Sequence, residues 1–164
     1  WSDRVGKNFI LRINAGGSIV LGPRVSFRDN VIVNITGGKI NIKGDVFFND
    51  MTCINSRNCI NIGQNTIVGQ GVFFYDHDHD YNSDSVKDNY ILGTIEVGKN
   101  VWIGSRVTVL RDSKIGDSSV IGAMSLIKGN ISSGTLNYTK KKLVNKEIKK
   151  VEKSVETNQS SRKT

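Results

Sequence analysis

The sequence predicts a mainly β protein, a parallel β-helix of hexapeptide repeats in which short strands form a continuous coil. The main observation is an aliphatic side chain at every sixth position, with a small or β-branched residue four positions later. Glycine accounts for 17 of the 164 residues and proline for one, and the glycines lack the Gly-x-y period of collagen. The clearest run of aliphatic positions is Val97, Ile103, Val109, Ile115, Ile121 and Ile127.

A six-residue period fits neither an α-helix, which needs a period near 3.6, nor a half-buried strand, which needs a period of two. It fits flat sides of one hexad each, with an inward aliphatic residue and a glycine at the corner. Glycine suits a corner because it allows a positive φ or close packing. Three hexads would close a triangular turn of about 18 residues, and stacked turns would bury one aliphatic column. The corner glycines of the clearest run are Gly98, Gly104, Gly116 and Gly122.

The same rhythm recurs upstream in three shorter runs, separated by phase slips that predict insertions at the corners. The interval from Phe74 to Val97 is too long for a corner, so residues 76–94 are expected to leave the coil as an irregular excursion loop, a common place for function. The upstream runs are Leu21–Phe27–Val33, Ile42–Phe48–Ile54 and Ile62–Val68–Phe74.

The rhythm fades near the C-terminus, where apolar residues are spaced by four, three and four positions, which predicts a short amphipathic α-helix. We therefore expect a β-helix domain over residues 1–136 and a basic C-terminal helix and tail over 137–164. The apolar residues of this helix are Val144, Ile148, Val151 and Val155.

The net charge of +8 belongs mostly to the tail, since residues 137–164 hold nine Lys and Arg against three Glu. The expected β-helix domain shows no basic helix with interleaved aromatic residues, so no nucleic-acid partner is expected. No apolar run reaches the roughly 18 residues of a membrane span, so no integral membrane segment is expected. Cys53 and Cys59 match neither a disulfide scaffold nor a zinc knuckle. We expect them to be small buried side chains in a reducing compartment, which favours a cytoplasmic location.

Two histidines, His77 and His79, lie at the start of the excursion loop and alternate with Asp76, Asp78 and Asp80. Imidazole titrates near neutral pH and can take a proton from an alcohol. A neighbouring carboxylate can hold one ring nitrogen while the other acts as the base. A solvated acidic loop without a catalytic role is the alternative, and a hard cation on the three aspartates is another. Two histidines fall short of a three-histidine zinc set, so no metal is predicted.

The segments VGKNVWIGSRVTVL, SKIGDSSVIGAMSLIK and FFYDHDHDY resemble the hexapeptide-repeat O-acetyltransferases, which act on galactosides, maltose, xenobiotics and bacterial surface polysaccharides. The resemblance covers roughly residues 17–136. It implies a left-handed coil, acetyl-CoA as the donor, and a homotrimer with the donor cleft between two protomers. It also implies that His77, rather than His79, is the general base.

The resemblance also implies the donor site. Trp102, Gly104 and Ser105 match the part near the thioester, Ala123 matches a further main-chain contact, and Lys128 lies where the nucleotide end would be. Two departures concern this site: Met124 stands where a glycine is usual, and the usual final G-[VI]-P-A segment is replaced by LNYTKKKL. The three lysines of that segment are candidates for the CoA phosphates or form a solvated face.

On the acceptor side, Asn49 matches a sugar-contacting asparagine of the family, with Asp50 beside it and His79 as a further candidate contact. The sequence thus predicts an acetyl-CoA-dependent O-acetyltransferase that acts on a hydroxyl of a sugar or of a bacterial surface polysaccharide, such as a capsule, or its precursor. The reaction would use a ternary complex rather than an acyl-enzyme. The alternatives are a non-catalytic β-helix scaffold and an N-acetyltransferase that acts on an amino sugar.

Overall fold

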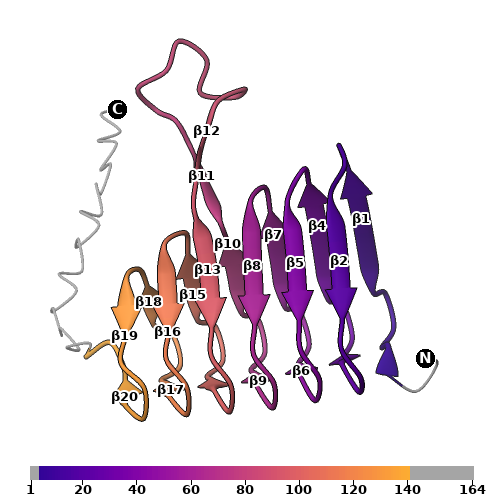
Figure 1. Cartoon of the computed structure of the whole chain (residues 1–164), viewed down its shortest axis with the longest axis vertical. Helices are drawn as coiled ribbons and strands as arrows, with labels where there is room; N and C mark the ends of the chain where they lie inside the picture. The colour runs from indigo at the N-terminus through magenta and orange to yellow at the C-terminus, as the bar shows by residue number, and fades with distance from the viewer. Residues whose placement is uncertain (1–3, 141–164) are drawn as a thin grey trace, which may run out of the picture.

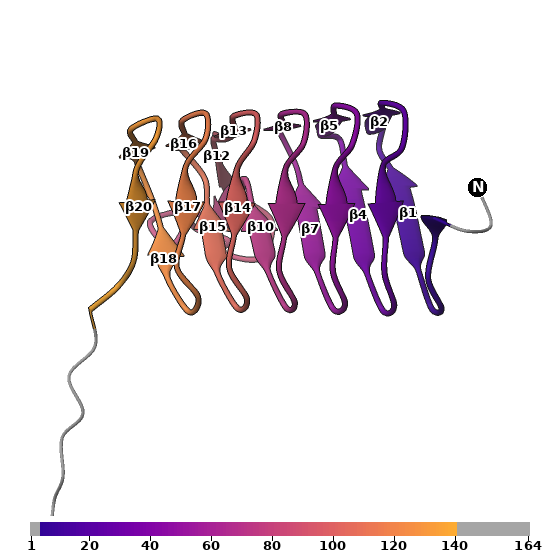
Figure 2. The ribbon, with the colours of Figure 1, turned by 90° about the horizontal axis from the view of Figure 1, so that it is seen from below.

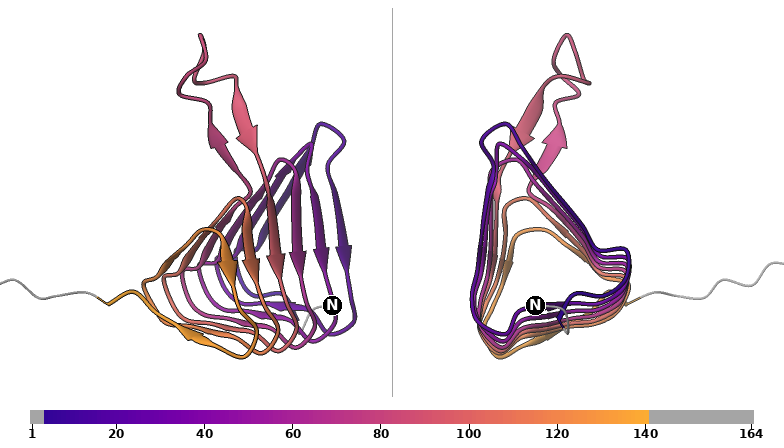
Figure 3. Two further views of the ribbon diagram at one scale, coloured as in Figure 1. Left: turned by 60° about the vertical axis from the view of Figure 1, so that its left-hand side comes forward. Right: turned by 90° about the vertical axis from the view of Figure 1, so that its right-hand side faces the viewer.

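The computed structural model describes residues 4–140 and shows a parallel β-solenoid of about six turns with three flat faces (Figure 1). Each face is a six-stranded parallel sheet, and the chain visits the three sheets in the same order on every turn. The end-on view in Figure 3 shows the triangular cross-section, and Figure 2 shows the turns stacked in one row. The predicted mainly β class and the parallel coil are confirmed. The left-handed sense stays a prediction.

Sheet I contains β1 (Ile10–Asn14), β4 (Ile32–Thr36), β7 (Cys53–Ser56), β10 (Phe73–Tyr75), β15 (Thr108–Leu110) and β18 (Leu126–Ile127). Sheet II contains β2 (Ser18–Leu21), β5 (Lys39–Ile42), β8 (Cys59–Ile62), β13 (Thr94–Val97), β16 (Ser113–Ile115) and β19 (Asn130–Ile131). Sheet III contains β3 (Ser26–Phe27), β6 (Phe47–Phe48), β9 (Ile67–Val68), β14 (Trp102–Ile103), β17 (Val120–Ile121) and β20 (Leu136–Asn137). We call the corners between them edges I/II, II/III and III/I.

The core is the aliphatic column that the hexads predict. All six aliphatic positions of the clearest run are buried, and so are the small residues four positions later, among them Val101, Val107 and Ser119. Upstream, the column continues through three phenylalanines, and the rings of Phe27 and Phe48 stack with centroids 5.0 Å apart. Removal of this surface from water is the main stabilising term of such a fold.

The turns shorten along the chain. Ile10 pairs with Ile32 in the first turn, whereas Val109 pairs with Ile127 in a late turn, so the late turn uses fewer residues to return to the same sheet. The expected corner insertions are therefore wrong. The extra residues of the early turns mainly make the individual strands of sheets I and II longer. The longer strands of sheet I add one more inward side chain, such as the fully buried Ile35, whereas the inward position of Ile40 is kept in the later turns as far as Ser113. Figure 3 shows the cross-section narrowing toward the C-terminal turns.

Between β10 and β13 the chain leaves the coil, as expected for residues 76–94, but Thr94 is already part of β13, and the segment is not irregular throughout. Its two ends, β11 (His77–His79) and β12 (Tyr90–Leu92), pair as an antiparallel ribbon that projects from edge I/II (Figure 1). A backbone hydrogen bond of 2.8 Å, donated by Gly93 N to Asp76 O, closes its base. The ribbon satisfies backbone groups that would otherwise need water or side-chain partners.

The corner glycines of the repeats do not have a positive φ, so close packing alone explains them. A Cβ atom on Gly104 would lie 2.7 Å from the backbone nitrogen of Ala123 in the next turn. The left-handed position of these corners lies two residues later and holds a non-glycine residue, such as Arg106 with φ 58° or Met124 with φ 60°. The usual glycine at position 124 is thus a conformational preference that this chain does not follow.

The last strand, β20, ends at Asn137, one residue beyond the expected domain boundary. The predicted C-terminal α-helix lies outside the described residues. Within residues 4–140, no helix is long and apolar enough to cross a membrane. Cys53 and Cys59 are free thiols, but they are only partly buried, because both lie on the outward side of their strands. The expectation that they are core side chains is therefore wrong.

Candidate functional site

His77 is positioned where the coil departs from its repeat. It is the first residue of β11, directly after the fully buried Asp76, and its side chain is 16% exposed. His77 Nδ1 lies 2.9 Å from Asp76 Oδ1. The pair therefore lies at the base of the hairpin, next to the rigid coil.

Three further donors surround the Asp76 carboxylate. Ser56 Oγ donates to Oδ2 over 2.7 Å, the backbone nitrogen of Arg57 donates to Oδ1 over 2.8 Å, and that of Asn58 donates to Oδ2 over 2.9 Å. Burial by itself would raise the pKa of Asp76. The hydrogen bonds from His77, Arg57, Ser56 and Asn58 outweigh the burial and hold this pKa below its ordinary value of 3.8. Asp76 is therefore a carboxylate at neutral pH.

The charge of Asp76 assigns the tautomer of His77. An ionised carboxylate only accepts hydrogen bonds, so Nδ1 of His77 carries the hydrogen and donates it to Asp76. Nε2 of the neutral ring is then left with its lone pair. This is the arrangement that a general base requires, with the second nitrogen oriented by a fixed partner.

His79 has a different environment on the same ribbon. It is exposed, and its Nδ1 lies 2.6 Å from the backbone oxygen of Val86 near the tip of the hairpin. Tyr90, its cross-strand partner, packs against both imidazoles, with ring centroids 4.6 Å from His79 and 5.6 Å from His77. The guanidinium of Arg57 lies over the Tyr90 ring, 3.6 Å from its centroid. Tyr90 thus links the two histidines with an arginine.

The other aspartates of the DHDHD segment point to separate partners. Arg111 Nε donates to Asp78 Oδ2 over 2.7 Å, which attaches the hairpin to the following turn. Asp80 Oδ1 accepts from the backbone nitrogen of Asn82 within the hairpin. Among the residues that the structure describes, no group of three His, Cys, Asp or Glu side chains could hold a metal ion.

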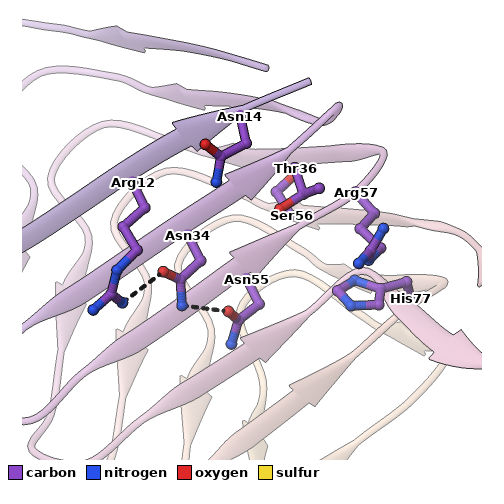
Figure 4. Close-up of a pocket in the computed structure, with 8 residues that line it drawn as sticks. All are labelled: Arg12, Asn14, Asn34, Thr36, Asn55, Ser56, Arg57 and His77. Atoms are coloured by element: carbon purple, nitrogen blue, oxygen red, sulfur yellow. Dashed lines mark hydrogen bonds between the residues drawn. The ribbon is translucent and has the colours of Figure 1, made fainter. Parts of the chain in front are cut away.

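A polar pocket of about 260 Å³ lies on sheet I next to His77 (Figure 4). One row of side chains follows the strands of sheet I, where Arg12 donates to Asn34 and Asn34 donates to Asn55. A second row follows edge I/II and ends at Arg57 and His77. The complete lining is Arg12, Asn14, Asn34, Thr36, Asn55, Ser56, Arg57 and His77. We call it the His77 pocket.

Of the residues that line this pocket, the sequence predicts a functional role only for His77. The signal for the others was the turn length, because Arg12, Asn34 and Asn55 follow one another at intervals of one full turn and so occupy one register position in successive turns. A repeat of polar residues at that interval marks an outward ladder on one face. The hexad period itself reports only the inward positions.

The predicted donor-site residues lie on other parts of the coil. Gly104, Ser105 and Ala123 follow strands of sheet III and form edge III/I, where the backbone nitrogen of Met124 donates to Ser105 O. Trp102 points outward from sheet III and is 55% exposed. The structure brings these residues together, but on a different edge from His77.

The predicted acceptor residues Asn49 and Asp50 also lie on edge III/I, so one protomer does not place them beside His77. Their side chains serve the corners: Asn49 Oδ1 accepts from the Asp50 nitrogen, and Asp50 Oδ1 accepts from the Asp29 nitrogen. Lys128, in contrast, lies on edge I/II, two turns beyond His77. Among the predicted residues, only Lys128 and His79 therefore share the edge of His77.

Comparisons with known proteins agree with this architecture. The family model described as bacterial transferase hexapeptide (six repeats) matches residues 94–129. The chain is 32% identical to a putative lipopolysaccharide biosynthesis O-acetyl transferase of Escherichia coli, over 82% of this chain and 66% of that protein. It is 31% identical to the galactoside O-acetyltransferase of Escherichia coli, over 58% of this chain and 47% of that protein. The chain thus spans just under two thirds of the first relative and about half of the second.

Two solved structures share the fold at low sequence identity. An N-acyltransferase from Bacillus cereus, in complex with dTDP and coenzyme A, is 21% identical with a TM-score of 0.67, covering 82% of this chain and 78% of that one. A hexapeptide-repeat acetyltransferase from Vibrio cholerae, complexed with acetyl coenzyme A, is 20% identical with a TM-score of 0.55, covering 82% of this chain and 64% of that one.

Proposed function

Because this chain belongs to the bacterial transferases with hexapeptide repeats, we propose that it is an acetyltransferase that uses acetyl-CoA as the donor. Its acceptor is a hydroxyl group of a sugar or of a bacterial surface polysaccharide or its precursor, in line with the relative named for lipopolysaccharide biosynthesis. The observation that carries the chemistry is the His77–Asp76 pair at the pocket, with a distance of 2.9 Å and a fully buried carboxylate.

The reaction proceeds in a ternary complex. Nε2 of His77 takes the proton from the acceptor hydroxyl as its oxygen attacks the thioester carbonyl. Main-chain N–H groups near Ser105 stabilise the resulting oxyanion, since the Gly104 nitrogen already donates to Ile121 O within the coil. The C–S bond then breaks, and His77 returns its proton to the departing thiolate, so that CoA leaves as the thiol and the acceptor carries an acetyl ester. Asp76 holds the imidazole and stabilises the imidazolium that forms between the two proton transfers.

The active site is shared between protomers of a homotrimer. Within one chain, His77 lies on edge I/II, and the donor residues lie on edge III/I. A neighbouring copy would bring its edge III/I, with Ser105 and Ala123, toward His77. Both faces beside edge III/I carry an outward apolar column, which suits self-association. The exposed members of these columns are Ile67, Trp102 and Leu136 on sheet III, and Phe73 and Leu126 on sheet I.

A thermal shift experiment tests the donor. Acetyl-CoA at about 100 times its Kd stabilises the folded state by roughly 2.7 kcal/mol. The scaffold alternative has no CoA site, so it predicts an unchanged melting temperature at millimolar acetyl-CoA. His77→Ala should lower acetyl transfer, followed through the release of free CoA thiol, by about 10²–10⁴-fold. His79→Ala is the matched control, and it should stay within a few-fold of the parent protein.

The class of product distinguishes O-transfer from the N-transfer for which the Bacillus cereus structural relative is named. An O-acetyl ester is cleaved by alkaline hydroxylamine at room temperature, whereas an amide is stable. We expect label from radioactive acetyl-CoA to be released by hydroxylamine. Label that resists hydroxylamine on an amino sugar would assign N-acetylation instead.

A further inference from the structure

We propose that the His77 pocket binds an acceptor sugar that carries an anionic group, a carboxylate or a phosphate, and that Arg12 and Arg57 recognise this anion. The inference rests on the proposed function, because it takes His77 as the base that faces the acceptor. It goes beyond that function because it assigns a chemical class to the acceptor and names the residues that select it.

The charge of the lining is one-sided. The pocket contains two guanidinium groups, three amide side chains, two hydroxyls and the imidazole, and no carboxylate is among the eight described residues that form it. The nearest acid in sequence, Asp76, is fully buried, and its oxygens accept from four neighbouring donors. The pocket therefore offers cations and amides to a ligand, and the buried Asp76 carboxylate behind it is not part of the lining.

The guanidinium of Arg57 is held by an aromatic ring rather than by a carboxylate. Its guanidinium lies over the Tyr90 ring at 3.6 Å, and its backbone nitrogen is fixed on Asp76. Within residues 4–140, Arg57 forms no ion pair, whereas Arg24 and Arg111 are both paired with aspartates. A guanidinium fixed by stacking keeps its in-plane donors available for an anion.

Arg12 is held by the asparagine ladder of sheet I. Its Nη1 donates to Asn34 Oδ1 over 3.1 Å, and Asn34 Nδ2 donates to Asn55 Oδ1 over 2.9 Å. No ion pair is found for Arg12 in the described part of the chain. The fork of Arg12 thus retains donors for a carboxylate or phosphate, and the ladder amides suit sugar hydroxyls. In Figure 4, Arg57 lies beside His77, and Arg12 lies on the opposite side of the pocket.

The size of the pocket limits the ligand that it encloses. Its volume of about 260 Å³ lies below the range of roughly 300–1,000 Å³ that is usual for drug-sized ligands. A single sugar unit therefore fits inside, and any longer glycan continues outside. The anion and the hydroxyl that His77 deprotonates would belong to the same sugar unit.

The test is a ligand-observed NMR titration of the full chain with three probes at low salt: D-galacturonic acid, D-galactose 1-phosphate and neutral D-galactose. At least one acidic probe should bind about tenfold tighter than galactose, the gain expected of one charge-assisted contact. The acid that gains identifies the carboxylate or the phosphate as the anion. Equal affinity for all three probes overturns the proposal.

Arg57→Gln and Arg12→Gln should each weaken the acidic probe about tenfold and galactose less than twofold. Arg12 is the second variant because it lies on the outermost strand, away from the hairpin that Arg57 helps to hold. Arg24→Gln, whose parent side chain pairs with Asp45 on edge II/III, is the matched control and should leave all three affinities unchanged. Equal losses for the acidic and neutral probes in both pocket variants would also overturn the proposal.

The titration contains no acetyl-CoA, so its result is independent of the donor experiment. Selective binding of acid without an acetyl-CoA shift would leave the pocket intact and refute the acetyltransferase. An acetyl-CoA shift without acid selectivity would refute only the acidic acceptor.

Discussion

Two edges of the same coil differ in how strictly they repeat. Edge III/I repeats one corner at almost every turn, with a left-handed residue at each, as at Asn30, Met51 and Arg106. Each corner is bonded to the one before it: Met51 N donates to Asp29 O, and Arg106 N donates to Gln70 O. Edge I/II changes from turn to turn and carries the hairpin, His77 and the pocket. The regular edge is governed by backbone packing, whereas the irregular edge leaves side chains free for chemistry.

The largest stability effect should come from the regular edge. In Gly104→Ala, the new Cβ would meet the backbone of the next turn at 2.7–2.8 Å, so the turn has to shift. Such overpacking costs about 3 kcal/mol, equivalent to a melting temperature lower by roughly 6–12 °C. Gly129→Ala on edge I/II is the control, because it has a φ of 91° but open space around it. It should cost only about 1–2 kcal/mol, and a larger loss at Gly129 would invert the comparison.

On the irregular edge, the largest effect should be on activity. Asp76→Asn replaces one of the two accepting oxygens by an NH₂ group that faces other donors, and it removes the negative charge that fixes the tautomer of His77. We expect acetyl transfer to fall about a hundredfold or more. Acetyl-CoA binding, measured by thermal shift, should persist. Asp78→Asn, which affects only the pairing with Arg111, is the matched control. An equal loss in both variants would indicate a general role of the hairpin rather than the His77–Asp76 pair.

Acid should destabilise the irregular edge through Asp76. Its pKa is lowered in the folded protein, so its stabilising contribution is present above the ordinary value of 3.8 and is lost as the pH falls through the folded pKa. Urea unfolding from neutral pH down to the acid range below that ordinary value should show a loss of stability confined to the acid end. The difference between the parent protein and Asp76→Asn should shrink there. A difference that stays constant over the whole range would contradict the assigned carboxylate.

The smallest effect should be a gain at the regular edge. Met124 has a φ of 60°, and its side chain is 53% exposed, so it contributes little packing. Met124→Gly relieves a backbone strain of about 1–2 kcal/mol but adds roughly 0.5–1 kcal/mol of chain entropy to the unfolded state. A net gain of about 0.5 kcal/mol is expected in urea unfolding. Ser118→Gly, at the equivalent position of edge II/III with φ 55°, should behave alike. Destabilisation of both variants would show that these corners carry no strain.

The residues that face the core, and the place where the chain leaves the coil, could be predicted from the sequence. The hexad column, the excursion over residues 76–94 and the special place of His77 at its start all follow from spacing and residue type. Buried aliphatic residues must recur with the geometry of the turn, so their period reports the turn directly. The longer early turns were misread as corner insertions, because an extended strand and an insertion at a corner shift the phase in similar ways.

The contacts between outward-facing polar side chains could be identified only from the tertiary structure. Arg12, Asn34 and Arg57 meet His77 only because the long early turns bring distant segments into one register. No local pattern shows that Asp76 is the buried partner of His77 while Asp78 pairs with Arg111. The amino-acid order thus determines which side chains face the core, because burial imposes a period. Which polar side chains meet is decided by the stacking of the turns, because their contacts join residues that lie a full turn or more apart along the chain.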